Sequence, residues 1–346
     1  MYGNAMRRGR RASGACHHQE MGPNAALSMP EDAAAPHDAG SLPGEVRALV
    51  GELVALGPRP SGSAASAAAA ELLTHALLAR DVAPYHGGSM ALQRAGGIVN
   101  LAAVVPGSER HRRPLVLASH YDGPAGSPAA GDNGAAAALL VVLAPLLAQR
   151  RLERDVIVVL LDAGDPDHAP ERALGAELFV RDQRRHDLKA AIVIDRVGHR
   201  SSTAVPPLLL VGAECDPRLP PALDALHARA PEVAPVPHRY LERVPAVDAF
   251  REQGIPALWL SGGRAPHHRG PDDRIEHLDD AMLEGTAAQL LALVELVADT
   301  RLPGPCGDHD VGAFVQRAWK RWAGRGRLSA GKLDRLVREA LPRLTP

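Results

Sequence analysis

The feature of this sequence that most constrains its fold is the alternation of short, unbroken apolar runs with longer segments of helical period. Runs such as 156–161 (VIVVLL) and 190–194 (AAIVI) are apolar at every position. A strand with one face in water alternates apolar and polar residues, so these runs indicate strands that are buried on both faces. Segment 134–150 has the length and composition of a buried helix. We therefore expect an α/β domain in which helices cover both faces of a sheet.

Length and composition divide the chain into three parts. Its 346 residues, 46% of them hydrophobic, suffice for one large core. Residues 1–43 are rich in Ala, Gly, Pro, His and Arg without periodicity, which predicts a disordered leader. The α/β domain follows over residues 44–301. Residues 302–346 begin with a linker around the sequence PGPCG and continue as a predicted helical tail.

The overall charge shows no bias toward polyanionic partners. The chain has 39 Lys and Arg residues against 40 Asp and Glu residues, for a net charge of −1. No apolar window reaches the roughly 18 residues that a membrane span requires. The arginines near the N-terminus are not followed by the apolar core of a secretory signal. We therefore expect no nucleic acid partner, no membrane span and a cytoplasmic location.

The C-terminal tail is the strongly basic part of the chain. Between Val311 and Pro346 there are nine Lys and Arg residues against two acidic ones. The simplest interpretation is a helical pair that packs on the domain and leaves a basic face in water. The alternative is a surface that contacts a partner or an anionic surface.

The three cysteines, Cys16, Cys215 and Cys306, lie far apart and are odd in number. Their spacing predicts neither a disulfide framework nor a C-x-x-C metal site. Cys215 follows a predicted strand, where a cysteine is most often a small buried hydrophobe.

Histidine and aspartate residues follow the predicted strands. They are His120, Asp122, Asp132, Asp165 and Asp195, with His267 and His268 in the loop after the last strand. A single residue of this kind is most often a helix cap or a satisfied polar group. In a doubly wound sheet, however, ligands bind beyond the carboxyl ends of the strands. Imidazoles together with several carboxylates form the donor set that Zn²⁺ prefers.

Several ordered blocks of the sequence carry a resemblance. They are ASHYD with the later GDNG, the segment AIVIDRVGH, and AFREQGIPALWLSGG followed by HHRGPDD. Over residues 49–298 the chain resembles the family-28 zinc metallopeptidases, a group that includes dizinc aminopeptidases and glutaminyl cyclases. The resemblance implies a three-layer α/β/α zinc-exopeptidase-like domain with a mixed, mainly parallel sheet. It also implies one or two zinc ions and a peptide substrate.

The resemblance also implies a metal site. His120, Asp132 and Asp195 would bind one zinc ion. Asp132 would bridge to a second ion, which is also held by Asp165 and a histidine. Asp122 would orient His120, as metal-bound imidazoles usually require.

The histidine of the second ion has alternatives. The family spacing counted back from Asp272 reaches His268, whereas the same spacing counted from Asp273 reaches Arg269. His268 is our prediction, with His267 as the fallback.

The chain departs from the family pattern where a general base is expected. Active members carry D-G-E-E after the strand that corresponds to 156–161. Here the residues read Asp162, Ala163, Gly164 and Asp165, so a glycine stands at the base position. Asp165 remains a possible zinc ligand with a shorter reach. A general base contributes about 10²–10⁴-fold in rate, so its loss bears directly on turnover.

Two readings keep a base in the site. In the first, a downstream side chain folds back over the site; the candidates are Asp167, His168 and Glu171. In the second, Asp165 is itself the base, and the second metal is weakly held or absent. For Asp167 and Glu171 we favour a role outside catalysis, in a solvated loop and at the start of a helix, where acidic side chains complement the helix dipole.

Three functions follow from these residues. The first is a zinc-dependent hydrolase, of aminopeptidase type, with an altered general base at position 164. The second is a catalytically impaired relative that binds metal or a peptide terminus. The third is a glutaminyl cyclase on the same scaffold, which would work with one zinc ion.

Overall fold

The computed structural model describes residues 40–85, 87–95, 97–165, 172–183, 188–199, 207–227, 233–241, 243–302 and 305–322, together with 335 and 338. All of them belong to the unit His37–Pro346. Most of the predicted leader and of the basic tail lies outside the described residues. The first helix begins at Leu42, two residues before the predicted domain boundary. Its start is set by Ser41, whose side chain accepts a hydrogen bond from the N–H of Gly44.

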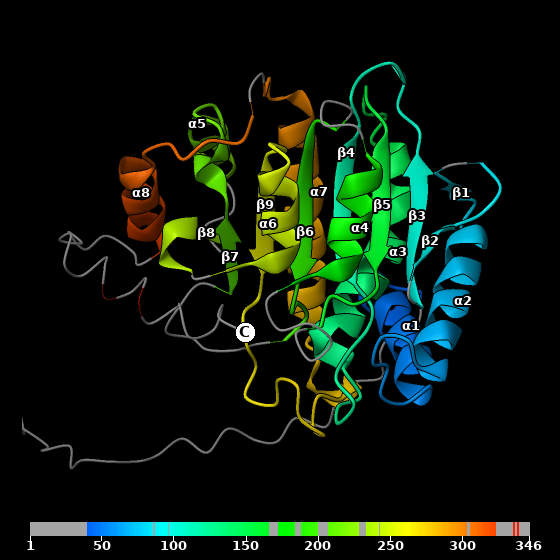
Figure 1. The fold of residues 1–346 in the computed structure, drawn as a ribbon. Helices are drawn as coiled ribbons and strands as arrows, with labels where there is room; N and C mark the ends of the chain where they lie inside the picture. The colour runs from blue at the N-terminus through cyan, green and yellow to red at the C-terminus, as the bar shows by residue number, and fades with distance from the viewer. Residues whose placement is uncertain are drawn as a thin grey trace, which may run out of the picture. The chain divides into compact units, whose positions relative to one another are not determined.

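The core of the described chain is a nine-stranded sheet (Figure 1). The strands are β1 Ala83–Pro84, β2 Ala91–Ala95, β3 Ile98–Val105, β4 Leu115–His120, β5 Val156–Leu161, β6 Ala190–Asp195, β7 Leu208–Val211, β8 Val233–Val236 and β9 Ala257–Ser261. Their order is β1-β3-β5-β4-β6-β9-β7-β8, and β2 pairs with β3. The central run β5-β4-β6-β9 is parallel, and antiparallel pairs flank it.

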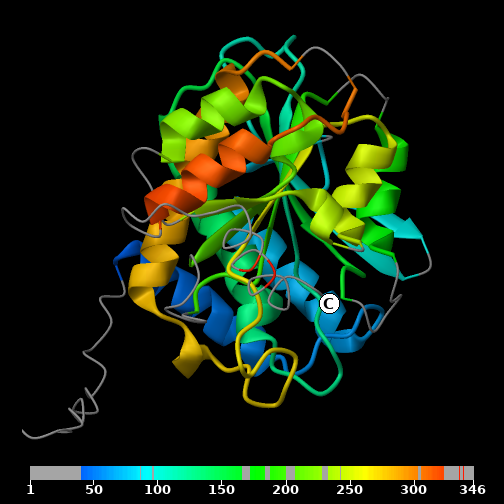
Figure 2. The same cartoon turned by 90° about the vertical axis from the view of Figure 1, so that its left-hand side faces the viewer.

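Helices cover both faces of this sheet. They are α1 Leu42–Ala55, α2 Ala64–Leu78, α3 Ala135–Gln149, α4 Leu174–Asp182, α5 Leu219–His227, α6 Pro245–Glu252, α7 Asp280–Asp299 and α8 Gly312–Trp322. Helices α1, α3 and α7 pack together on one face, and α4 and α6 pack on the other (Figures 1 and 2). The predicted three-layer α/β/α fold with a mixed sheet is confirmed.

The central strands bring their carboxyl ends to one edge of the sheet. Every residue of β5 is buried, as the unbroken apolar run predicted. The parallel register pairs His120 at the end of β4 with Leu161 at the end of β5. It likewise pairs Asp195, the last residue of β6, with Ser261 of β9. The polar residues that follow these strands therefore meet at the same edge.

Two helices of the described chain are long and apolar enough to cross a membrane. They are Ala130–Gln149, whose most apolar window is 89% buried, and Asp280–Asp299, whose window is 50% buried. Core helices of a folded domain meet the same criterion, so the expectation of no membrane span stays a prediction.

The structure corrects the sequence analysis on the cysteines. Cys215, which follows β7, forms a disulfide with Cys306 in the segment after α7. The N–H of Gly307 donates to the carbonyl of Cys215 at 2.8 Å, so the backbones already meet there. The prediction of no disulfide was wrong because 91 residues separate the partners, and only the tertiary fold brings them together.

The described part of the tail packs on the domain. Trp319 is fully buried and donates from Nε1 to the carbonyl of Pro235 in β8. Arg317 and Arg321 both bind the carboxylate of Asp224 in α5, at 2.9 and 2.6 Å. These contacts favour the simpler interpretation for α8, and a partner for the rest of the tail stays a prediction.

Candidate metal centre

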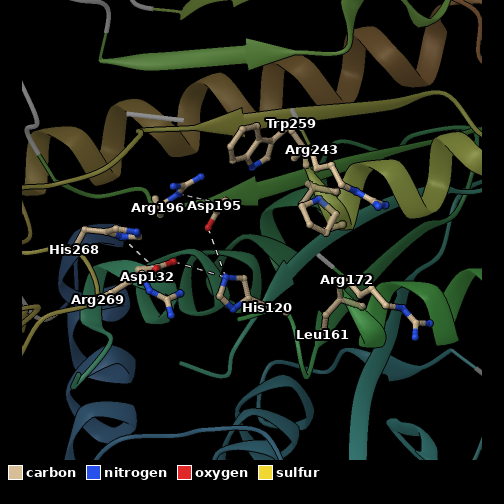
Figure 3. A pocket seen from close by; sticks show the side chains of 15 residues that line it. His120, Asp132, Leu161, Arg172, Asp195, Arg196, Arg243, Trp259, His268 and Arg269 are labelled. Carbon is tan, nitrogen blue, oxygen red and sulfur yellow. Dashed lines mark hydrogen bonds and ion pairs between the residues drawn. The ribbon is translucent and has the colours of Figure 1, made fainter. Parts of the chain in front are cut away.

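Three side chains from different segments converge at the edge of the sheet. His120 ends β4, Asp132 lies in the turn before α3, and Asp195 ends β6. Their donor atoms lie within 4.8 Å of one another. Nε2 of His120 is 3.7 Å from Oδ1 of Asp132 and 3.6 Å from Oδ1 of Asp195 (Figure 3). The structure thus brings together the three residues predicted to bind one zinc ion.

Asp122 holds the imidazole of His120 in place. Its Oδ1 lies 3.1 Å from Nδ1 of His120, which leaves Nε2 to face the other two carboxylates. The same carboxylate accepts hydrogen bonds from the backbone N–H groups of Gly164 and Asp165, each at 3.0 Å. Burial raises the pKa of Asp122, but these hydrogen bonds and the charge of His120 outweigh it and hold the pKa below its usual value. This contact is the one predicted for a carboxylate behind a metal-bound histidine.

Asp132 is positioned by a carboxylate that the sequence analysis did not single out as functional. Asp273 accepts hydrogen bonds from the N–H of Gly131 at 2.7 Å and from the N–H of Asp132 at 3.0 Å. The next residue, Asn133, anchors the same turn: its side chain is buried, donates a hydrogen bond to Ser119 and accepts one from the N–H of Arg196. The signal for Asp273 was its place in the closing block HHRGPDD, where it was used only to count back to the histidine.

The three side chains form an electrostatically strained group. Burial and the charge of Asp195 raise the pKa of Asp132 to about 7. Burial also raises the pKa of Asp195, but Arg196, whose Nε lies 3.0 Å away, and His120 outweigh burial and lower it. For His120, burial lowers the pKa, but the hydrogen bond to Asp122 and the nearby carboxylates of Asp195 and Asp132 raise it well above 6.5. Two buried carboxylates this close repel each other, so a proton or a cation between them stabilises the pair.

The residues fit a zinc ion. Oδ1 of Asp195 and Nε2 of His268 are buried and have no hydrogen-bond partner among the residues that the structure describes. Buried polar atoms without partners are rare in folded proteins and point to an absent ligand or water. One imidazole and two carboxylates, with a carboxylate behind the imidazole, suit Zn²⁺.

Of the two candidate histidines, His268 faces the site. Its Nδ1 lies 3.2 Å from Oδ2 of Asp132, so the two oxygens of Asp132 face two different histidines. Burial and the charge of Arg196 lower the pKa of His268 to about 3, which keeps its imidazole neutral. His267 instead stacks on His277 with ring centroids 4.4 Å apart.

The structure does not bring Asp165 into this group. Both of its oxygens are bound by the guanidinium of Arg269, at 2.8 and 3.1 Å. Gly164 beside it has no room for a side chain, because a Cβ there would lie 2.4 Å from Cβ of His120. The downstream candidates Asp167, His168 and Glu171 lie outside the described residues.

A pocket opens beside the three metal-binding candidates (Figure 3). Its apolar wall includes Leu161, Val193 and Trp259, and Arg172 and Arg243 lie on its far side from His268. Arg172 pairs with Glu177, and Arg243 lies 3.6 Å from Glu252. The pocket therefore joins a cluster of metal donors to an apolar surface that suits a side chain of a ligand.

A family model built from known proteins matches the part of the chain that contains this site. The model of peptidase family M28 matches residues 100–294, which is more than half of the chain. The chain belongs to peptidase family M28. The match spans β3 to α7, so it contains His120, Asp132, Asp195 and His268. A comparison with curated protein sequences finds no match.

Solved structures of other proteins share the fold of this M28 chain. A zinc aminopeptidase from Bacillus subtilis matches with a TM-score of 0.60 and 13% identity, covering 78% of this chain and 98% of that one. A glutaminyl cyclase from Porphyromonas gingivalis matches with a TM-score of 0.58 and 18% identity, covering 73% and 97%. A Zn-dependent exopeptidase from Parabacteroides distasonis matches with a TM-score of 0.57 and 15% identity, covering 75% and 98%. At these identities the likeness shows the fold alone.

Proposed function

We propose that this protein is a zinc-dependent hydrolase of the aminopeptidase type that works with an altered general base. The observation that carries the proposal is the convergence of His120, Asp132 and Asp195 at one end of a pocket. Membership of family M28 supports it, as does the buried Oδ1 of Asp195, which accepts no hydrogen bond from the residues that the structure describes.

The residues around the site have separate tasks in this proposal. His120, Asp132 and Asp195 would hold the zinc ion, which when bound supplies Lewis-acid polarisation of a carbonyl and activation of water. Asp122 fixes the ring of His120, and Asp273 fixes the backbone of Asp132. The apolar wall formed by residues such as Trp259 would receive the side chain of the substrate.

The step for which the described site offers no suitable residue is proton transfer by a general base. Gly164 cannot supply a base, and the carboxylate of Asp165 is held by Arg269. A missing general base costs about 10²–10⁴-fold in rate. We therefore expect slow turnover unless a residue outside the described part of the chain, such as Asp167, completes the site.

The same observations favour a second candidate function, a catalytically impaired relative that binds a metal ion or a peptide terminus. The backbone at Gly164 packs against His120, and both oxygens of Asp165 are bound by Arg269. A third candidate, glutaminyl cyclisation, is supported by the fold of the cyclase neighbours alone.

One set of assays separates these candidates. Aminoacyl-amide hydrolysis that requires zinc, stops in a chelator and is lost in His120→Ala supports the hydrolase. Zinc binding without turnover supports the impaired relative. Ammonia release from a peptide with an N-terminal glutamine, without cleavage, supports the cyclase. The matched control is His75→Ala, because His75 is exposed on α2. Failure of the wild-type protein to bind zinc would overturn the hydrolase and the cyclase and would leave only a relative that binds a peptide terminus without metal.

A further inference from the structure

We propose that the centre holds a single metal ion because the guanidinium of Arg269 takes the place of a second cation beside Asp165. This inference deepens the proposed function and rests on metal binding at His120, Asp132 and Asp195. It assigns to Arg269 a role in setting how many ions the site accepts.

The first step concerns Asp132, which has two faces. Its Oδ1 faces His120, at 3.7 Å from Nε2, and its Oδ2 faces His268, at 3.2 Å from Nδ1. On the first face Asp195 completes a set of three donors. On the second face, His268 and Asp165 are the residues that would join Asp132 in holding a second ion. Among the described residues these three do not form a donor group as compact as the first.

The second step concerns that carboxylate. Nη1 of Arg269 donates to Oδ2 of Asp165 at 2.8 Å, and Nη2 donates to Oδ1 at 3.1 Å. A two-pronged pair of this kind uses both oxygens and is the strongest geometry that an arginine makes with a carboxylate. The side chain of Asp165 is only 3% exposed and that of Arg269 only 18%, so water screens the pair little. A metal ion at Asp165 would have to displace this guanidinium.

The third step concerns how the loop presents Arg269. The residue has φ +59°, in the left-handed region that non-glycine residues seldom adopt. The turn is held by hydrogen bonds from the N–H of His268 to Ala265 and from the N–H of Gly270 to His267. Figure 3 shows His268 and Arg269 on the same side of the pocket as Asp132. From this turn the side chain of Arg269 reaches Asp165 at the centre and is mostly shielded from water.

The fourth step concerns the charge around the centre. Arg196 pairs with Asp195, and burial together with the charges of Arg196 and Arg269 lowers the pKa of Arg264. Arginine stays charged in proteins and, unlike a bound ion, is never lost. A second divalent ion at Asp165 would be repelled by the guanidinium of Arg269, which already neutralises that carboxylate.

Metal stoichiometry tests the inference. After equilibration with zinc and removal of loose ions, wild-type protein should hold one zinc ion per chain by elemental analysis, and Arg269→Ala should hold two. Adding Asp165→Asn to Arg269→Ala should return the count to one. Arg274→Ala is the matched control, since Arg274 lies five residues along and its side chain is 59% exposed.

The outcomes are distinct. Two ions in the wild type, or one ion in both the wild type and Arg269→Ala, would overturn the inference while leaving metal binding intact. No ion in the wild type would instead overturn the proposed function. If Arg269→Ala does not fold, as judged by thermal unfolding, Arg269→Gln serves in its place, because it keeps a hydrogen bond to Asp165 without the charge. It should likewise hold a second ion, and a single ion in this variant would also overturn the inference.

Discussion

The backbone of Gly164 lies directly against the side chain of His120. A Cβ at position 164 would be 2.4 Å from Cβ and 2.8 Å from Cγ of the histidine, well inside contact distance. The N–H of Gly164 is also bound to Asp122, the carboxylate that orients the same imidazole. The absence of a side chain at position 164 therefore makes the room that His120 occupies, so the loss of the base and the position of this metal ligand depend on the same residue.

Gly164→Ala should weaken zinc binding. The added methyl group must push the side chain of His120 away from Asp132 and Asp195, and displaced supports of metal ligands typically cost about 10–100-fold in affinity. Overpacking should also lower the free energy of unfolding by about 1–3 kcal/mol. Calorimetric titration with zinc and thermal unfolding check both effects. Gly126→Ala is the control, because nothing lies within 4 Å of a Cβ there. Unchanged zinc affinity in Gly164→Ala would contradict the packing described, and Gly164→Glu should meet the same obstacle.

Asp273→Asn should loosen the turn that presents Asp132. An amide offers one acceptor oxygen where the carboxylate accepts from both Gly131 and Asp132, so one buried N–H loses its partner at a cost of about 1–3 kcal/mol. Zinc affinity should fall as well, because Asp132 is no longer held. Asp272→Asn is the neighbouring control, with a side chain that is 70% exposed. Equal zinc affinity in the two variants would show that Asp273 does not position the site.

The disulfide should be detectable by counting thiols. The chain has three cysteines, so denatured protein should show one free thiol without reductant and three after reduction, because Cys215 is bonded to Cys306. Cys306→Ser should lower stability by about 2–4 kcal/mol, whereas Cys16→Ser should not. Three free thiols in protein purified without reductant would rule out the bond. Disulfides persist mainly in oxidising compartments, so the same result bears on the cytoplasmic location, which stays a prediction.

Asp248→Asn should destabilise the protein at neutral pH but not in acid. Asp248 in α6 lies 2.8 Å from Nε2 of His238 and accepts from the N–H of Val244 at 2.9 Å. Burial raises its pKa, but these hydrogen bonds outweigh burial and hold the pKa below its ordinary value of 3.8. A carboxyl with a lowered pKa in the folded state contributes stability above its unfolded pKa, and this contribution is lost as the pH falls through the folded value.

The deficit of Asp248→Asn should therefore be about 1–2 kcal/mol at neutral pH and should shrink below about pH 4. Urea unfolding at several pH values measures it. Glu252→Gln on the same helix is the control, with a side chain that is 66% exposed. A deficit that does not change with pH would show that the ionised carboxylate is not the source.

The sequence predicted the parts of this molecule that depend on local pattern. The apolar run 156–161 specified a buried strand, and the parallel ends of β4 and β6 made the meeting of His120 and Asp195 foreseeable. The pairing of Asp165 with Arg269 was not foreseeable, because it spans 104 residues and depends on the left-handed backbone of Arg269. The closed space at Gly164 was hidden for a similar reason. The sequence shows only that position 164 has no side chain. The fold shows that His120 occupies the volume that such a side chain would need.

The most direct test of the metal centre is a crystal structure of zinc-soaked protein with anomalous scattering measured at the zinc absorption edge. The account predicts one strong anomalous peak, bounded by Nε2 of His120 and by carboxylate oxygens of Asp132 and Asp195, with Arg269 still bound to Asp165. A structure with no peak among these three side chains would contradict the central claim.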